Sequence, residues 1–151
     1  MIGDYHYKCK KVDEVKSRFG ISQIEGIVDE SKNFISSIEL LKIPSEGIIL
    51  LENPYTQPKF RTPKENYLKE IIRHLSKEFK EDEKYESYIE LIESESLKDK
   101  GWQRIYHENG WKNFSSSHPY SYWVAKGMNL EDREQIRRAR KVIKDLFKLP
   151  R

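Results

Sequence analysis

The fold of this chain is decided by residues 47–51, Gly-Ile-Ile-Leu-Leu. The four consecutive apolar residues leave no polar face, so a strand built from them must be covered on both sides. Two isoleucine-rich runs, residues 21–28 and 34–43, precede this stretch, and the polar residues 30–33 between them have the composition of a hairpin turn. The sequence therefore predicts a small three-stranded sheet over about residues 21–51, with residues 47–51 at its centre.

Helical patterns lie on both sides of this predicted sheet. Residues 12–19 predict a short N-terminal helix that ends at Gly20, a residue suited to a left-handed C-cap. Residues 53–61 contain two prolines and predict a loop, after which residues 62–65, Thr-Pro-Lys-Glu, combine a capping box with a proline at the first helical position. This combination predicts a helix over about residues 63–80.

Residues 81–95 are strongly acidic, with seven acids and one base. The apolar residues among them recur at i, i+3, i+4 and i+7, the spacing of one helix face, at Tyr85, Tyr88, Ile89 and Ile92. The pattern predicts a helix over about residues 83–95 with its charges in solvent. Such an acidic helix can also pair with a basic helix of a second copy, in a homo-oligomer.

The C-terminal segment is the most basic part of the chain. From Arg133 onward it has eight basic and two acidic residues, a net charge of +6, whereas the whole chain carries +3. On a helix the cations fall on one stripe and the apolar residues on the opposite face. With Asn129 as N-cap, the sequence predicts an amphipathic helix over about residues 130–148. Its candidate phosphate-binding residues are Arg133, Arg137, Arg140, Lys141, Lys144 and Lys148.

Aromatic residues are concentrated in the segment before this helix, which is predicted to connect the helical elements. All three tryptophans, Trp102, Trp111 and Trp123, lie within 22 residues of one another. Tryptophan rings can stack on the bases of single-stranded nucleic acid. In a chain with few aliphatic residues, however, large aromatic side chains are the efficient way to close a core. Of these two roles, core packing is the one that we expect for the three tryptophan rings taken together.

These elements predict one α+β domain over residues 1–151. Cys9 is the only cysteine, so an internal disulfide is impossible, and no apolar run approaches the length of a membrane span. The N-terminus has no apolar signal segment, and these features together predict a cytoplasmic protein without a membrane partner. The sequence contains no phosphate-binding loop, nucleophile elbow or paired metal motif. It therefore predicts no cofactor and no metal site, and it identifies no catalytic residue.

The basic stripe predicts a polyanionic partner. The leading hypothesis is a nucleic-acid-associated module that contacts phosphates through the C-terminal helix. The segment 121–132 resembles short helical tails of some DNA enzymes of phages and mobile elements, which implies an origin of that kind. The alternative is a protein-interaction or inhibitor module that uses the same charged helices against a protein surface.

A second alternative is a nuclease that depends on Mg²⁺. The predicted order of helix, three strands and helix resembles the core of the PD-(D/E)xK nucleases, in which carboxylates on adjacent strands hold Mg²⁺ and a lysine orients the attacking water. The candidates that the resemblance implies are Glu14, Asp29, Glu39 and Lys42, or Glu52 with Gln57-Pro58-Lys59. Two residues separate Glu39 from Lys42 where the family has one, which places their side chains on opposite faces of a regular strand.

Overall fold

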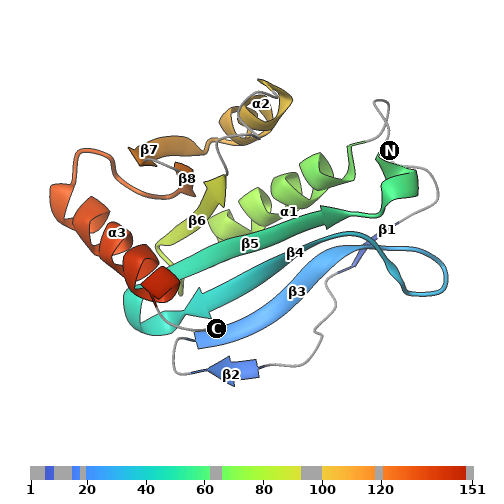
Figure 1. The fold of residues 1–151 in the computed structure, drawn as a ribbon, viewed down its shortest axis with the longest axis horizontal. Coiled ribbons are helices and arrows are strands. Elements are labelled where there is room, and N and C mark those ends of the chain that lie inside the picture. Colours follow the sequence, from blue (N-terminus) through green and yellow to red (C-terminus); the bar gives the residue numbers. More distant parts are fainter. Residues whose placement is uncertain are drawn as a thin grey trace.

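The computed structural model describes residues 6–8, 15–17, 20–61, 66–92, 100–117 and 121–148, with side chains for residues 20–61, 66–92, 103–114 and 124–146. In these ranges the chain forms one mixed sheet and three α-helices (Figure 1). The strands are β1 (His6–Lys8), β2 (Val15–Ser17), β3 (Gly20–Val28), β4 (Phe34–Ile43), β5 (Ile48–Thr56), β6 (Ser87–Ile92), β7 (Lys112–Ser117) and β8 (Ser121–Lys126). The helices are α1 (Tyr67–Glu81), α2 (Lys100–Glu108) and α3 (Arg133–Lys148).

The strands follow the order β1-β3-β4-β5-β6-β8-β7, and β2 also pairs with β3. Among the described strands, β5 and β6 are the one parallel pair, and all other neighbours are antiparallel. A parallel pair needs a crossover connection, which α1 provides here. The three predicted strands are confirmed, but the prediction that they form a small sheet of their own is wrong, because they are part of an eight-stranded sheet.

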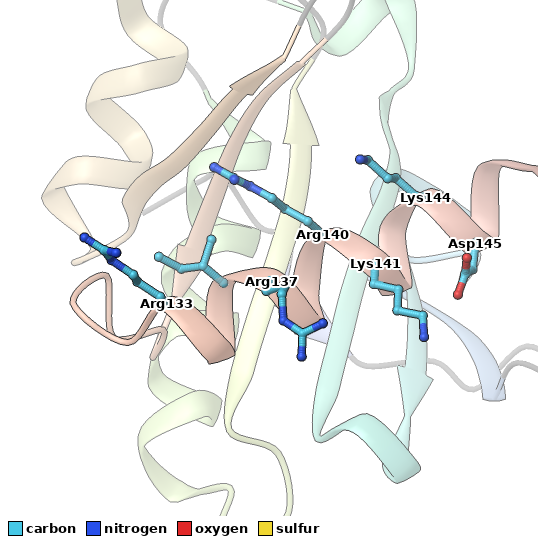
Figure 2. Close-up of a pocket in the computed structure, with 7 residues that line it drawn as sticks. Arg133, Arg137, Arg140, Lys141, Lys144 and Asp145 are labelled. Carbon is cyan, nitrogen blue, oxygen red and sulfur yellow. The ribbon is translucent and has the colours of Figure 1, made fainter.

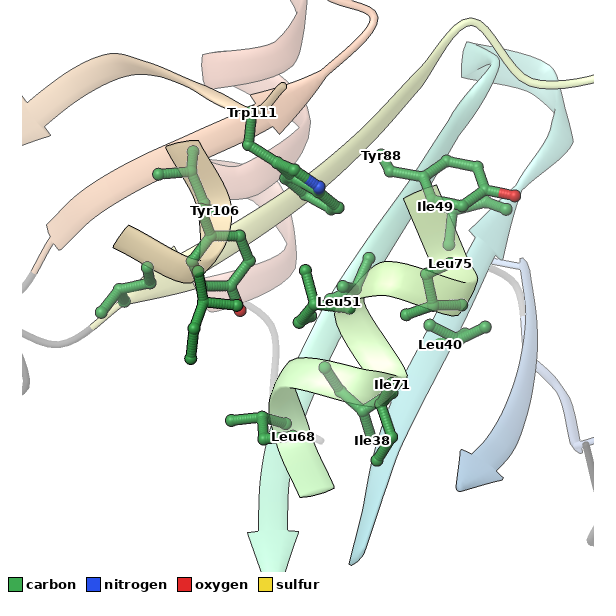
Figure 3. Packing of buried hydrophobic residues seen from close by; sticks show 14 of the residues in the cluster. Ile38, Leu40, Ile49, Leu51, Leu68, Ile71, Leu75, Tyr88, Tyr106 and Trp111 are labelled. Carbon is green, nitrogen blue, oxygen red and sulfur yellow. The ribbon is translucent and has the colours of Figure 1, made fainter. Parts of the chain in front are cut away.

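Residues 48–51 lie in the middle of this sheet, as their composition predicts. Leu50 is 2% exposed and Leu51 is 1% exposed, and the two side chains point into different cores. The α1-side core lies under α1 and α2 (Figure 3) and contains Ile27, Ile35, Ile38, Leu40, Ile49, Leu51, Tyr67, Leu68, Ile71, Ile72, Leu75, Tyr85, Tyr88, Ile92, Ile105, Tyr106, Trp111 and Val124. The α3-side core contains Ile43, Ile48, Leu50, Ile89, Phe114, Ala125, Met128, Ala139, Ile143 and Leu146.

The helix predicted over residues 83–95 is wrong. Residues 87–92 form β6, which pairs with β5 on one side and β8 on the other. Tyr88 and Ile89 enter different cores, and five of the six residues of β6 are buried. Apolar residues at i, i+3, i+4 and i+7 fit a helix face, but the same short run also fits a strand that is covered on both sides. Pairing with β5 and β8 favours the strand over the helix for these residues.

Two further predictions of secondary structure are corrected. The helix predicted over residues 12–19 is replaced, in its described part, by the short strand β2. The aromatic segment is not a connection, since it forms α2, β7 and β8. Trp111 is 2% exposed, its Nε1 donates to Ser76 Oγ at 2.8 Å, and its ring meets Tyr106 edge to face. Packing is therefore confirmed for Trp111, whereas the side chains of Trp102 and Trp123 lie outside the described residues.

The helices predicted over residues 63–80 and 130–148 are confirmed with changed starting points. The predicted capping box at residues 62–65 lies outside the described residues, and α1 begins after Asn66, whose side chain accepts from Lys69 N at 3.0 Å. Asp132, not Asn129, caps α3, because its Oδ1 accepts from Glu134 N and Gln135 N. None of the helices in the described part of the chain is both long and apolar enough to cross a membrane.

Gly127, which follows β8, has φ 88°, and a Cβ there would lie 2.2 Å from Phe79 Cζ and 2.4 Å from the Glu86 carbonyl oxygen. Gly47 also has a positive φ, 66°, but its Cβ would have no neighbour nearer than 3.5 Å. We expect Gly47→Ala to lower the free energy of unfolding by about 1–2 kcal/mol, the cost of the left-handed conformation. Gly127→Ala should lower it further, because backbone must also move. Urea unfolding of both variants measures the difference, and equal losses would contradict this account of the β8 turn.

Candidate active site

The parallel pair β5 and β6 separates at one end. Their pairing runs from Ile48 opposite Ser87 to Leu51 opposite Glu90. Beyond that point β5 continues with β4 as far as Thr56, while β6 continues with β8. In sheets with parallel strands, ligands bind beyond the carboxyl ends of the strands, where neighbouring connections diverge. The end of the β5–β6 pair is therefore the candidate site.

The separation has a local cause in β5. Asn53 has φ 49° and is followed by Pro54, which has no N–H to donate. Opposite them, the register of β4 shifts between Ser37 and Glu39. A bulge of this kind bends the strand and increases its twist. The loop predicted over residues 53–61 is thus wrong for residues 53–56, because a bulge gives proline a place within a strand.

Glu90 is the most unusual side chain at this end of the sheet. It is 1% exposed, and its Oε2 has no hydrogen-bond partner in the described part of the chain. Burial raises the pKa of the Glu90 carboxyl to about 8. A buried carboxyl with an unsatisfied oxygen weakens the fold, so its presence in a core calls for a functional explanation.

Glu90 faces α1, because side chains alternate along a strand and its neighbours Tyr88 and Ile92 both belong to the α1-side core. Aromatic residues from the α2 region enter the same core, with the rings of Tyr106 and Trp111 5.2 Å apart at 76° (Figure 3). The hydrogen bond from Trp111 to Ser76 ties this region to α1. The acid therefore lies in a rigid and largely apolar environment, which explains the direction of its pKa shift.

The first turn of α1 lies at the same end of the sheet as the separation (Figure 1). A helix N-terminus presents backbone N–H groups and a partial positive charge, both of which attract anions. Lys69 adds a formal charge in this turn, and its Nζ lies 3.6 Å from Glu108 Oε2 at the end of α2. The candidate site thus combines a buried acid with a helix end that favours an anionic group.

The basic stripe lies elsewhere. Five of its six predicted residues, Arg133, Arg137, Arg140, Lys141 and Lys144, are exposed and line a groove along α3 with Ile136 and Asp145 (Figure 2). The side chain of Lys148 lies outside the described residues. The buried face of α3 packs on the α3-side core, on the opposite face of the sheet from Glu90. The stripe is therefore no part of the candidate site.

Within the groove, two arginines have partners in the chain itself. Arg137 pairs with Glu134, one turn earlier on α3, and Arg140 Nη2 donates to the Phe114 carbonyl oxygen at 3.4 Å. The cations thus form the solvated face of a packed amphipathic helix, with some of them held by the chain.

The residues proposed for a nuclease do not assemble into a metal centre. Asp29 caps the β3–β4 turn by accepting from Asn33 N at 2.9 Å, and Glu39 accepts from Asn53 Nδ2 at 2.8 Å. Lys59 lies in a short 3-10 helix after β5. In the described chain, none of the candidate acids belongs to a group of three that could hold a metal ion, and Glu14 lies outside the described side chains. The resemblance to PD-(D/E)xK nucleases is therefore not supported.

Sequence reasoning missed Glu90 because it lies in an acidic run that was assigned to solvent. A signal was nevertheless present, since two apolar residues precede Glu90 and two follow it, in Tyr-Ile-Glu-Leu-Ile. An acid in the middle of such a run is buried if the run is a central strand.

No protein-family model matches the chain, and a search of curated protein sequences finds no significant match. Solved structures do match. A proposed acyl-CoA N-acyltransferase from Klebsiella pneumoniae has a TM-score of 0.52 at 12% sequence identity, over 72% of this chain and 73% of that one. A chimera of the spermidine N-acetyltransferase from Vibrio cholerae and hSSAT has a TM-score of 0.51 at 16% identity, over 69% of this chain and 68% of that one.

A second chimera of those two enzymes has a TM-score of 0.51 at 12% identity, over 79% of this chain and 69% of that one. These neighbours are described as acyltransferases. The prediction of a nucleic-acid module of phage or mobile-element origin, with nucleic acid as its partner, is therefore wrong. The nuclease alternative is wrong for the same reason. The protein-interaction alternative gains no support from them. The chain shares its fold with these solved N-acyltransferase structures.

Proposed function

We propose that this chain is an N-acyltransferase that transfers an acyl group from an acyl-CoA thioester to an amine. The observation that carries the proposal is the buried Glu90 carboxyl at the point where β5 and β6 separate. The fold that the chain shares with N-acyltransferases supports it.

The described residues fit an acyl-CoA donor in two respects. After Leu51 the edge of β5 that faces β6 is released from pairing, and free strand edges bind the amide groups of extended ligands. The first turn of α1, with Lys69, would hold the phosphates. When bound, the donor supplies an acyl group that is already activated as a thioester. The sequence has no glycine-rich phosphate-binding motif between β5 and α1. In this proposal, the phosphates are therefore bound by the N-terminal end of α1 and Lys69.

Glu90 is suited to remove the proton that an amine must lose in this reaction. Alkyl amines are protonated at neutral pH, with pKa values of about 10, and only the neutral form attacks a carbonyl. A carboxylate whose pKa is about 8 is a much stronger base than an ordinary glutamate, and it is largely ionised above pH 8. Its apolar surroundings also keep bulk water away from the proton transfer.

The test is acyl transfer by the full chain with acetyl-CoA and a panel of amines, including spermidine and lysine amide, measured as release of the free thiol. We expect Glu90→Gln to lower kcat by about 100-fold or more, because the general base is lost. Glu83→Gln is the matched control, since Glu83 is an exposed acid that precedes β6, and it should leave the rate unchanged. Absence of thiol release by the wild-type chain with every amine would refute the proposed function.

The pH profile separates the role of Glu90 from the function itself. Because a base must be ionised to act, kcat/KM of the wild-type chain should rise with pH and level off above about 8. Glu90→Gln should lose this inflection. A wild-type profile without an inflection near 8, in a chain that does transfer acyl groups, would leave the activity standing and remove Glu90 as the base.

Folding stability gives an independent check on Glu90. The native carboxyl keeps its proton up to about pH 8, whereas the unfolded one loses it near 4.5, so unfolding releases a proton between these values. The free energy of unfolding contributed by this group therefore falls by about 1.4 kcal/mol per pH unit between about 4.5 and 8, and is level above that range. We expect Glu90→Gln to remove this slope and Glu83→Gln to keep it, as measured by urea unfolding from pH 5 to 9.

A further inference from the structure

Three side chains with metal-ligand chemistry meet where α1 packs on β3. They are Glu25 of β3 and the pair His74 and Glu78 of α1, and one donor atom of each lies within 4.8 Å of the other two. His74 Nε2 and Glu78 Oε1 are already 3.0 Å apart. Four residues apart on a helix, these two side chains share one face and can reach a common ion.

The third residue is held in place from within the sheet. Glu25 is 3% exposed, and its Oε1 accepts from Gln23 Nε2 at 3.1 Å. Metal-binding carboxylates are commonly oriented by a second hydrogen bond of this type. The helix pair is more open, with 36% of the His74 side chain and 37% of the Glu78 side chain exposed. The cluster thus has a buried, oriented ligand on one side and access from solvent on the other.

The charges in the cluster favour an added cation. One oxygen of the Glu25 carboxylate and one of the Glu78 carboxylate lie within 4.8 Å of each other. Two carboxylates brought together in a partly buried place repel each other, and a divalent ion between them would remove that repulsion.

We propose that Glu25, His74 and Glu78 form a Zn²⁺ site that clamps α1 to β3. One imidazole nitrogen and two carboxylate oxygens, with a fourth position open to water, are a ligand set that Zn²⁺ accepts. Bonds of about 2.0–2.1 Å in a tetrahedron separate the ligand atoms by about 3.3 Å, close to the spacing of the His74–Glu78 pair. Rotation of the part-exposed His74 and Glu78 side chains would bring their donor atoms to Glu25. The site is independent of the acyl-transfer proposal.

The test is calorimetric titration of ZnCl₂ into the untagged full chain after treatment with a chelator. We expect one bound ion per chain and a rise in Tm that the chelator reverses, because a ligand of the native state stabilises it. His74→Ala and Glu78→Gln should each weaken binding by about 10-fold or more. Both residues are part-exposed, so these variants are expected to fold, and their Tm without metal checks this.

The matched control is His107→Ala, which removes an exposed histidine on α2, outside the cluster. It should bind Zn²⁺ as the wild-type chain does. If Zn²⁺ neither binds nor raises Tm, the three residues are an ion-pair network only and the proposal is overturned. The proposal is also overturned if His74→Ala and Glu78→Gln bind with wild-type affinity, because the ion then lies outside the cluster. It is overturned as well if Mg²⁺ binds more tightly than Zn²⁺, because the site is then not a Zn²⁺ site.

Discussion

The parallel pairing of β5 with β6 is the constraint on which the rest of the structure depends. Both strands place apolar residues on both faces of the sheet, so each face must be covered. Because the strands are parallel, the chain has to cross over between them, and α1 makes this crossover on one face. The other face is then left for α3. The same pairing ends at Leu51 and Glu90, so the constraint that builds the core also creates the opening at its end.

The opening and the buried acid belong together physically. The Glu90 carboxyl is surrounded by core residues and still lies beside strand edges that are no longer paired to each other. Its burial costs stability, and a cost of this kind is typical of groups that a protein keeps for chemistry. The cations of α3 differ from Glu90 in this respect. Their charges are prominent in the sequence, but they remain in solvent, because they lie on the exposed side of a helix whose other side is packed.

The functional hypotheses drawn from composition failed for that reason. Net charge and its location describe what a surface can attract, but they carry no information on fold. The nuclease alternative failed because it grouped residues by their order along the chain. Glu39 and Asp29 are engaged in local hydrogen bonds of a bulge and a turn, while the acids that do come together with a histidine, Glu25 and Glu78, are on elements that the sequence pattern does not connect.

Local patterns by themselves determined β3, β4, the apolar part of β5, α1 and α3, since each has a clear periodicity or a continuous apolar run. Only the tertiary structure decided residues 83–92 and 101–117. Tyr88 and Ile89 fit a helix and a buried strand equally well, and the choice depends on β5 and β8 as partners. The candidate site could not be predicted from the sequence either. The burial of Glu90 and the approach of Glu25 to His74 result from the packing of several elements and are not properties of any one segment.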